Sequence, residues 1–599
     1  MPKIPARSEI DPKTTWNAES VFASPADWQA EADAILAAIP AVKAFQGKLG
    51  KSATTFADAL AALEDLQVRA ERLAMYAGFS YSVDTADQNA AAMADKAGGV
   101  YGQVVAASAY LRPEMLEIGE QTLRQWVAAE PHLAVYEHFV HDLFRKQAHV
   151  RSSEVEEILG MLADPFGGAG SSTSMLTNAD FKFPPVQIAD GNELDLTQGT
   201  LQKILNGPDR DARQRAWTQY LETYLAHKNT LATNLATSIK QNVFLMRARK
   251  HESTLGASLF ENNIDTAVFH NLIDVFKKNL PVWQRYFDIR RKALGVDELH
   301  PYDLWAPLTP NSPTLTYEQA VDWICDGLAP LGADYVATVR KGCLEERWVD
   351  VYPNQGKRNG AFSWGAPGTH PFIMLSFGGN MLGLSTLAHE LGHSMHSYLT
   401  WENQPIVYTN YSLFVAETAS NFNQALVRGY LLESNPDKDF QIAVIEEAMS
   451  NFLRYFFIMP TLARFELETH QRAEKGQPLN ADALMTLMAD LFTEGYGDKV
   501  KINREHVGMI WATFGHLFSD YYVYQYATGI SGAHALSRRV LDGVPNAVED
   551  YTKFLKAGSS LYPLDALKVA GVDLTTPAPV EETFAVMASY IDRLEKLTK

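Results

Sequence analysis

The residues best suited to chemistry form the pentapeptide His389-Glu390-Leu391-Gly392-His393, in which two histidines flank a glutamate. On a helix, residues four positions apart lie on the same face, so both imidazoles can offer a ring nitrogen to one ion. Neutral imidazole is a preferred ligand of zinc. Glu390 is rotated by about 100° from His389 around the helix, so it can reach a metal-bound water without being a ligand. The pattern therefore predicts a zinc site on this helix.

A third ligand would distinguish a zinc site from a solvent-exposed helix face that carries histidines, because both would have the same HExxH sequence pattern. One standard pattern, HExxHxxGxxH, supplies a third histidine. It fails here because His396 stands at its glycine position and Leu399 at its last histidine position. We expect His396 to line the cleft or to form a hydrogen bond behind the ligands.

The other standard pattern takes a glutamate from a later helix, and Glu417 is the main candidate. It lies in the strongly helical stretch 412–433, close to the apolar residues Leu413 and Phe414. An unpaired carboxylate would be costly to bury there, and a metal ion is its natural partner. Glu402 is a weaker candidate because it lies in a turn-like stretch of sequence.

The elements that must position these residues are mostly helices. The motif lies in a helical segment, 381–400, whose apolar stripe falls on the side opposite the histidines. β-rich runs precede it at 348–352, 360–364 and 371–377. Periodicity also predicts helices over 28–45, 56–81, 90–110, 114–140 and most of 209–294. The glycine-rich run 167–173 lacks the GK[ST] of a phosphate-binding loop, and we expect a plain loop there.

The composition excludes several classes of protein. The 599 residues are 46% hydrophobic and 21% charged, which is typical of a folded globular protein and not of a disordered one. A net charge of −19 argues against binding to nucleic acid or anionic lipid, and no apolar run is long enough for a transmembrane helix. Two cysteines cannot frame a disulfide scaffold, and the N-terminus lacks the apolar core of a signal peptide. We therefore expect a cytoplasmic protein without nucleic-acid or membrane partners.

Longer motifs around these residues carry a resemblance to a known family. HELGHSMHS (389–397) followed by FVAETASNFN (414–423) resembles the thimet oligopeptidase-type metallopeptidases, and most of all their oligoendopeptidase F branch. GAFSWG and PFIMLSFGG within 360–379, and HLFSDYYVYQYATG (516–529), extend the similarity. The resemblance covers residues 205–585 well, and the helical first part of the chain is compatible with it.

The resemblance implies a role for each residue of the motif. The ligands of one zinc ion per chain fall on His389, His393 and Glu417, and Ser420 follows Glu417 in an E-x-x-S pattern. The general base falls on Glu390. Zinc is also favoured over cobalt or manganese by this ligand type.

Contacts to substrate and to the developing oxyanion are implied near the C-terminus. They fall on His516 and on the run of Tyr521, Tyr522 and Tyr524. Tyr524 is favoured as the oxyanion donor, although the spacing from His516 is shorter than in the thimet oligopeptidase branch and leaves the choice of tyrosine open. Tyr526 follows closely, and four tyrosines in six positions cannot all face one site, so we expect at least one in the interior or on the surface.

The implied fold is a mainly α, multi-helical, two-lobed ellipsoid that encloses a deep substrate channel, with a small β-sheet beside the zinc site. Its parts would be an N-terminal helical region (1–115), an oligopeptidase N-terminal helical domain (116–204) and a catalytic zinc metallopeptidase domain (205–599). A channel would admit short flexible peptides and exclude folded proteins. The strand near 361–364 would bind an extended peptide by strand addition.

The implied activity is zinc-dependent hydrolysis of internal bonds in short oligopeptides, by Glu390-assisted attack of zinc-bound water. A dipeptidyl carboxypeptidase would carry the same zinc motif, and a non-catalytic peptide-binding protein could keep the cleft. A zinc aminopeptidase is disfavoured because no GxMEN motif precedes the histidines. The intact set of ligands and base favours an enzyme over a binding protein.

Overall fold

The structure is a computed structural model that describes residues 4–188 and 191–599. The chain is mainly helical with small sheets, as predicted, and it forms two compact units. The first unit comprises Met1–Ala148, Thr314–Tyr430 and Leu536–Gly571, and the second comprises His149–Pro313, Leu431–Ala535 and Val572–Lys599. In the part of the chain that the structure describes, no helix has the length and apolar character needed to cross a membrane.

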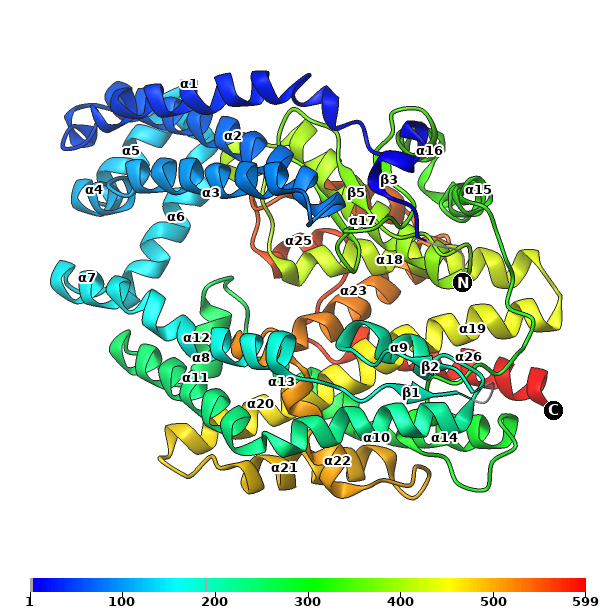
Figure 1. The fold of residues 1–599 in the computed structure, drawn as a ribbon. Helices are drawn as coiled ribbons and strands as arrows, with labels where there is room; N and C mark the ends of the chain where they lie inside the picture. Colours follow the sequence, from blue (N-terminus) through cyan, green and yellow to red (C-terminus); the bar gives the residue numbers. More distant parts are fainter. Residues whose placement is uncertain (1–3, 189–190) are drawn as a thin grey trace. The chain divides into compact units, whose positions relative to one another are not determined.

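The N-terminal part of the first unit is a group of packed helices (Figure 1). Their bounds are α1 Pro25–Lys43, α2 Ala53–Val83, α3 Gln88–Ser108, α4 Leu111–Ile118, α5 Glu120–Ala129 and α6 Glu137–Lys146. The side chains of Ser24, Ser52 and Asp87 cap α1, α2 and α3, respectively, by accepting hydrogen bonds from backbone N–H groups. Trp28, Leu66 and Val100 are among the buried residues through which α1, α2 and α3 pack together.

The helix predicted over 114–140 is broken in the structure. Gly119 has a φ of +88°, a conformation that favours glycine, and it separates α4 from α5. Pro131 then begins a 3₁₀ helix, Pro131–Tyr136, before α6. The apolar periodicity continues across both breaks because all three helices bury residues in one cluster, which includes Met115, Leu123 and Val140.

The β-rich runs form a small sheet in the first unit, with the order β3–β5–β4. β3 (Val349–Asp350) is parallel to β5 (Phe372–Met374), and β4 (Phe362–Trp364) is antiparallel to β5. The register pairs Val349 with Ile373 and Ser363 also with Ile373. β5 is fully buried, whereas β4 lies at one edge of the sheet.

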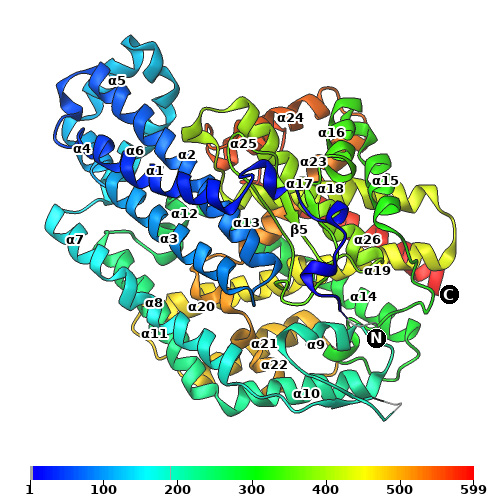
Figure 2. The same ribbon diagram turned by 45° about the horizontal axis from the view of Figure 1, so that its top comes forward.

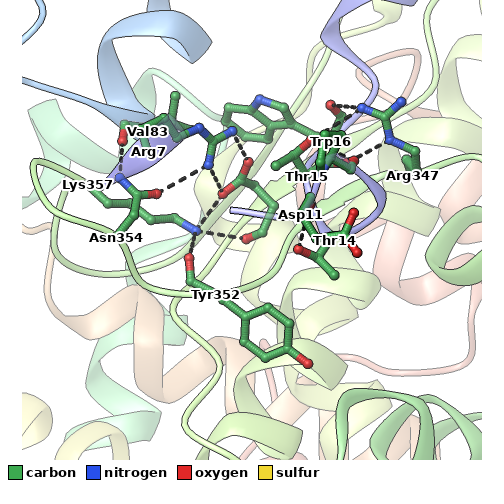
Figure 3. A network of polar contacts seen from close by, with 12 residues as sticks. Arg7, Asp11, Thr14, Thr15, Trp16, Val83, Arg347, Tyr352, Asn354 and Lys357 are labelled. Atoms are coloured by element: carbon green, nitrogen blue, oxygen red, sulfur yellow. Dashed lines mark hydrogen bonds and ion pairs between the residues drawn. The ribbon is translucent and has the colours of Figure 1, made fainter. Parts of the chain in front are cut away.

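The N-terminal segment is fastened to the opposite edge of the sheet, beside β3 (Figure 3). The Arg7 guanidinium donates to both carboxylate oxygens of Asp350, at 2.9 and 2.5 Å, and Lys357 Nζ lies 2.6 Å from the same carboxylate. The backbone N–H of Val351 donates to the carbonyl of Thr14. Trp16 packs against α2 and β5. Sequence-distant residues therefore cover the β3 edge and leave β4 as the open edge.

The first unit contains further helices after its N-terminal group. They are α15 Tyr317–Gly327, α16 Ala333–Leu344, α17 Met381–Asn403, α18 Leu413–Ser434 (through Tyr430), α24 Ala547–Ala557 and α25 Pro563–Val569. α17 contacts both β4 and β5. The sheet thus supports the helix that carries the histidine motif.

The second unit is also helical (Figure 2). It has a short antiparallel pair of strands, β1 and β2, which are labelled in Figure 1. Its elements are α7 Ser153–Met161, α8 Ala163–Met175, β1 Val186–Gln187, β2 Glu193–Leu194, α9 Gln198–Leu205, α10 Arg210–Ala226, α11 Lys228–Ala248, α12 Thr254–Phe260, α13 Thr266–Lys278, α14 Leu280–Ala293, α19 Lys438–Phe452, α20 Met459–Glu474, α21 Ala481–Tyr496, α22 Arg504–Gly508, α23 Tyr524–Leu541 (through Ala535) and α26 Ala578–Thr598.

The expectation of a plain loop over 167–173 is wrong, because this run lies within the helix α8. α8 packs along α11, where the ring of Phe166 lies 5.8 Å from that of Phe244. Asn234 Nδ2 also donates to Thr173 Oγ1 at 3.0 Å. Packing against α11 offsets the low helix propensity of the glycines.

Candidate active site

α17 presents the two histidines of the motif on the side away from its buried stripe. Asn380 caps the helix by accepting the N–H of Gly383, and Leu384, Leu387, Leu391 and Met395 are all buried, as the apolar periodicity predicts. The histidines are only half-buried. The helix continues to Asn403, so Glu402 lies on its last turn and not in a turn-like stretch; its side chain is exposed.

α18 brings Glu417 to the two histidines. The Glu417 side chain is buried, with its Oε2 3.6 Å from Nε2 of His389. One ligand atom from each of His389, His393 and Glu417 lies within 4.8 Å of the others, and the described residues contain no second such group of His, Cys, Asp or Glu. Two imidazoles and one carboxylate are a donor set that zinc accepts, and it leaves a position for water or substrate. The residues present therefore fit the ion.

Gly392 allows the two ligand-bearing helices to approach closely. A Cβ atom at this position would lie 2.5 Å from the carbonyl oxygen of Ala419 and 2.6 Å from the Cα of Ser420. Both atoms belong to the backbone of α18, which cannot move aside as a flexible side chain can. The glycine of the motif is therefore required by the packing that places Glu417 beside the histidines.

Gln424 orients His389, a role that sequence reasoning missed. The Gln424 Nε2 donates to Ser385 Oγ at 2.7 Å, which turns the amide oxygen toward His389 Nδ1 at 3.1 Å. The imidazole then carries its proton on Nδ1 and presents the Nε2 lone pair to the metal position. Gln424 lies on α18, two turns after Glu417, and this helical spacing is the only signal in the sequence that could have indicated it.

Further contacts surround the ligands. Ser420 Oγ donates to the Glu417 carboxylate at 3.2 Å, so the serine of the E-x-x-S pattern holds the candidate ligand. His396 is buried and stacks on Tyr411, with ring centroids 3.7 Å apart. Tyr411 in turn shares a hydrogen bond with Ser397, at 2.7 Å between their hydroxyl oxygens. His396 therefore packs behind the site through its ring.

The electrostatics of the site suit a cation. Burial lowers the pKa of the His393 imidazole to about 4, against the opposing attraction of Glu417, so this ring is neutral and can donate a lone pair. Burial raises the pKa of the Glu390 carboxyl to about 7, while His389 and the backbone N–H of Ser363 oppose this shift and the charge of Glu417 adds to it.

The edge strand β4 lies directly beside the motif helix. Ser363 Oγ and Ser394 Oγ are 2.8 Å apart, and Ser394 Oγ also donates to the carbonyl of Glu390 at 2.9 Å. The backbone N–H of Ser363 forms a hydrogen bond with the Glu390 side chain. This places the open edge of the sheet next to the candidate base.

His516, Tyr521, Tyr522 and Tyr524 all belong to the second unit. His516 lies in a 3₁₀ helix, Gly515–Phe518, and its ring centroid is 5.7 Å from that of Tyr522 and 6.0 Å from that of Tyr526. The Tyr526 hydroxyl donates to the Tyr522 hydroxyl at 3.3 Å. Desolvation, and then the charge of Arg454, lower the pKa of His516. These three side chains form one cluster.

Tyr521 and Tyr524 instead lie in the interior of the second unit. Both rings are fully buried and contact Phe269 edge-on, at 5.7 and 5.4 Å between centroids. The Tyr521 hydroxyl is 2.9 Å from Thr254 Oγ1, and burial raises the pKa of both tyrosines far above the ordinary range. As expected, the tyrosines do not all face one site.

Comparisons with known proteins agree with the family resemblance that the sequence motifs carry. The model of peptidase family M3 matches residues 204–586, and the model named Oligopeptidase F matches residues 114–183. The Bacillus subtilis (strain 168) protein Oligopeptidase PepF is 39% identical over 596 residues, which cover 99% of this chain and 89% of that protein.

Solved structures agree in fold. The crystal structure of oligoendopeptidase-F from Enterococcus faecium is 28% identical, with a TM-score of 0.75 and coverage of 95% of this chain and 98% of that one. A crystal structure from Chlamydophila abortus is 30% identical, with a TM-score of 0.89 and coverage of 99% and 100%. The chain belongs to peptidase family M3, in its oligopeptidase F branch, and it is a metallopeptidase.

Proposed function

We propose that this peptidase cleaves internal bonds of short oligopeptides and that one zinc ion per chain serves the reaction. The observation that carries the proposal is the grouping of His389, His393 and Glu417 around one point, with Glu390 on the same helix. The names of the relatives, oligopeptidase and oligoendopeptidase, support the substrate class.

His389, His393 and Glu417 would hold the ion. When bound, zinc supplies Lewis acidity, which polarises the scissile carbonyl and makes a water molecule easier to deprotonate. Gln424 and Ser420 keep two of the ligands in their binding orientation.

Glu390 acts as the base. Its carboxylate takes a proton from the attacking water and passes it to the nitrogen of the leaving amine, so no net proton is consumed by the side chain. Its buried position beside the backbone of Ser363 keeps competing solvent away from the carboxylate.

His516 and Tyr524 are proposed to stabilise the oxyanion, with Tyr521 and Tyr522 as substrate contacts. The resemblance carries these roles. Tyr522 is the alternative donor, because it already lies beside His516 and its hydroxyl accepts from Tyr526. Loss of the true donor should lower kcat by about 10²- to 10³-fold. Comparing Tyr524→Phe with Tyr522→Phe identifies it.

The finer architecture remains a proposal drawn from the family. It consists of a two-lobed ellipsoid with a deep substrate channel and of the division into 1–115, 116–204 and 205–599. A peptide would extend the sheet at the open edge of β4. Cys325 and Cys343 are free thiols, which is consistent with the cytoplasmic location that we propose.

The experiment that tests the proposal compares the wild type with Glu390→Gln on an internally quenched peptide. The variant should retain its zinc, measured by metal analysis, and should lose about 10²- to 10⁴-fold in kcat. A variant that still turns over at the wild-type rate would exclude Glu390 as the base.

The reaction products distinguish the proposed endopeptidase from two other functions. A dipeptidyl carboxypeptidase would release dipeptides from the C-terminus, and mass spectrometry would show this directly. A non-catalytic peptide-binding protein would hold zinc and bind peptide without releasing fragments.

A further inference from the structure

The edge strand β4 ends in an exposed aromatic residue, Trp364. It is 43% exposed, whereas the other ten tryptophans of the chain are buried or half-buried. A single exposed ring on a protein surface needs no explanation by itself. The position of this ring, one residue after Ser363 at the open edge of the sheet, gives it a possible role in binding.

The indole of Trp364 rests on the helix α2 and is held there. A Cβ atom at Gly78 would lie 2.7 Å from Cζ3 of the indole, so the ring occupies the space that a larger residue at position 78 would need. The ring also meets Phe79, with centroids 5.7 Å apart and planes nearly perpendicular. One side of the indole is therefore fixed, and a contact with its exposed part costs little side-chain entropy.

Trp364 and Ser363 point to opposite faces of the sheet, as successive residues of a strand do. The side chain of Ser363 contacts α17, where its Oγ lies 2.8 Å from that of Ser394. The side chain of Trp364 contacts α2 instead. Because the backbone N–H of Ser363 forms a hydrogen bond with Glu390, Trp364 directly follows a residue that contacts the candidate base.

The outer edge of β4 is free to pair with a further strand. Apart from the ladder with β5, residues 361–365 form no backbone–backbone hydrogen bond with another described segment. A peptide along this edge would place the side chain opposite Trp364 on the same face as the indole, with the two Cβ atoms about 4.5–5.5 Å apart. In strand addition the main chain supplies affinity, and side chains at alternate positions supply specificity.

The surroundings of the indole favour an apolar partner. Phe79, which touches the ring, belongs to a buried apolar cluster that also packs against Phe362. A cation already lies close by, since the Arg72 guanidinium donates two hydrogen bonds to the carbonyl of Pro367, three residues after Trp364. Its charge disfavours a second cation, although an indole face alone can attract one. An aromatic or large aliphatic side chain gains from ring contacts and from the removal of apolar surface from water.

We propose that Trp364 is a specificity-determining residue that binds an aromatic or large aliphatic side chain of a peptide paired with β4. The proposal rests on the peptidase function proposed above and on strand addition at this edge. It adds a preference for one type of side chain at one position of the peptide. Because the contact is the same in the bound substrate and in the transition state, it should act on KM more than on kcat.

The test measures KM for a set of internally quenched peptides. All carry alanine around the cleaved bond, and each has phenylalanine at one position in turn. At the position opposite Trp364, phenylalanine should lower the KM of the wild type by about two- to tenfold relative to alanine. Lysine at the same position should give no such gain.

Two variants at the ring and one beneath it show whether the gain depends on Trp364. Trp364→Ala should remove the gain at this one position, and Trp364→Phe, which keeps an aromatic ring, should retain part of it. Gly78→Ala should also reduce the gain, because its Cβ would displace the indole. A general disturbance of the fold would instead raise KM for all the peptides alike.

Tyr101→Ala is the matched control for the loss of an exposed ring. Tyr101 is 36% exposed on α3 of the same unit, and its loss should leave every KM ratio unchanged. Gly102→Ala is the control for Gly78→Ala, since a Cβ at position 102 would meet no side chain of another element. The proposal is overturned if no position shows a gain that depends on Trp364, or if lysine there lowers KM more than phenylalanine does.

A binding measurement separates this proposal from the proposed function. Labelled alanine and phenylalanine peptides bind to the Glu390→Gln variant without turnover, and the ratio of their dissociation constants should fall to about one when Trp364→Ala is added. If the wild type cleaves nothing but this ratio changes as stated, the peptidase function fails and the contact with Trp364 stands. If cleavage is normal and the ratio stays the same, the contact alone is wrong.

Discussion

Gln424 holds His389 through an amide, whereas metal-binding histidines are commonly held by a carboxylate or a backbone carbonyl. The ligand set itself could be predicted from residue types and spacing, because two histidines at helical spacing and a buried glutamate are the chemistry of a zinc site. Gln424 could not, because the direction of its amide depends on Ser385 of the neighbouring helix. The ligands could therefore be predicted from the sequence, but the neighbouring side chain that orients one of them could not.

We predict that Gln424→Leu weakens zinc binding by about 10- to 100-fold, since the imidazole loses the acceptor that fixes its tautomer. Gln424→Glu restores an acceptor with a negative charge and should bind zinc at least as tightly as the wild type. The measurement is the zinc dissociation constant, obtained by competition with a chromophoric chelator. Equal affinities for the leucine variant and the wild type would contradict the role of Gln424.

Glu466 provides a prediction on pH. This buried carboxyl accepts the N–H of Tyr521 at 2.6 Å, and its other oxygen has no partner among the described residues. Burial raises its pKa well above the usual 4.5, opposed by the Tyr521 N–H and assisted by the charge of Asp520. The folded state thus holds this proton more tightly than the unfolded chain does, so its contribution to stability is full below about pH 4.5 and is lost as the pH rises through the folded pKa.

The variant Glu466→Gln should remove this dependence. Its melting temperature relative to the wild type should increase as the pH rises above about 4.5 towards the raised pKa of Glu466. Glu468→Gln, on the same helix but with a side chain that is 46% exposed, is the control and should show no such trend. A difference that is constant across this range would show that Glu466 does not titrate as described.

At the scale of elements, the site depends on how closely α17 and α18 approach at Gly392. The individual helices follow from apolar periodicity, and their predicted positions are close to those observed. Breaks and exceptions depend on local backbone or on tertiary contacts. Gly119 interrupts a continuous apolar pattern, and the glycine-rich α8 is helical because α11 packs along it. Neither effect can be predicted from the spacing of apolar residues along the chain.

Gly392→Ala should destabilise the fold by about 1–3 kcal/mol and weaken zinc binding, because its Cβ would press on the backbone of α18. The measurements are the free energy of unfolding by urea and the zinc dissociation constant. Gly98→Ala and Gly102→Ala in α3 are matched controls, since a Cβ at either position would meet no atom within 4 Å other than those of its chain neighbours and of the nearby backbone of its own helix. They should stabilise the protein by about 0.5–1 kcal/mol. If Gly392→Ala behaves like the controls, the close approach is not required.

The attachment of the N-terminal segment gives a second prediction at this scale. Asp350 is buried between Arg7 and Lys357, and the Lys357 side chain is only 1% exposed. Asp350→Asn leaves that lysine without its counter-charge and should cost about 3–5 kcal/mol in unfolding free energy. Glu120→Gln breaks the surface pair with Arg124, in which both side chains are 47% exposed, and should cost less than about 1 kcal/mol. Equal losses in the two variants would exclude a buried network at Asp350.

At the scale of the whole molecule, the residues proposed for catalysis come from both compact units. The zinc ligands and Glu390 belong to the first unit, and His516 and the tyrosines belong to the second. Sequence similarity over the full chain predicts this combination, but the spacing of His516 and Tyr524 did not reveal that Tyr524 is buried beside Phe269 while Tyr522 lies beside His516. Rings of the same type, two positions apart, differ only in what the fold places around them.

The most direct measurement of the central claim is the mass of the products from a short N-acetylated peptide, incubated with the wild type and with Glu390→Gln at equal zinc content. We predict fragments from an internal bond with the wild type and intact peptide with the variant. C-terminal dipeptides alone, or the same fragments from both proteins at the same rate, would contradict a zinc endopeptidase with Glu390 as its base.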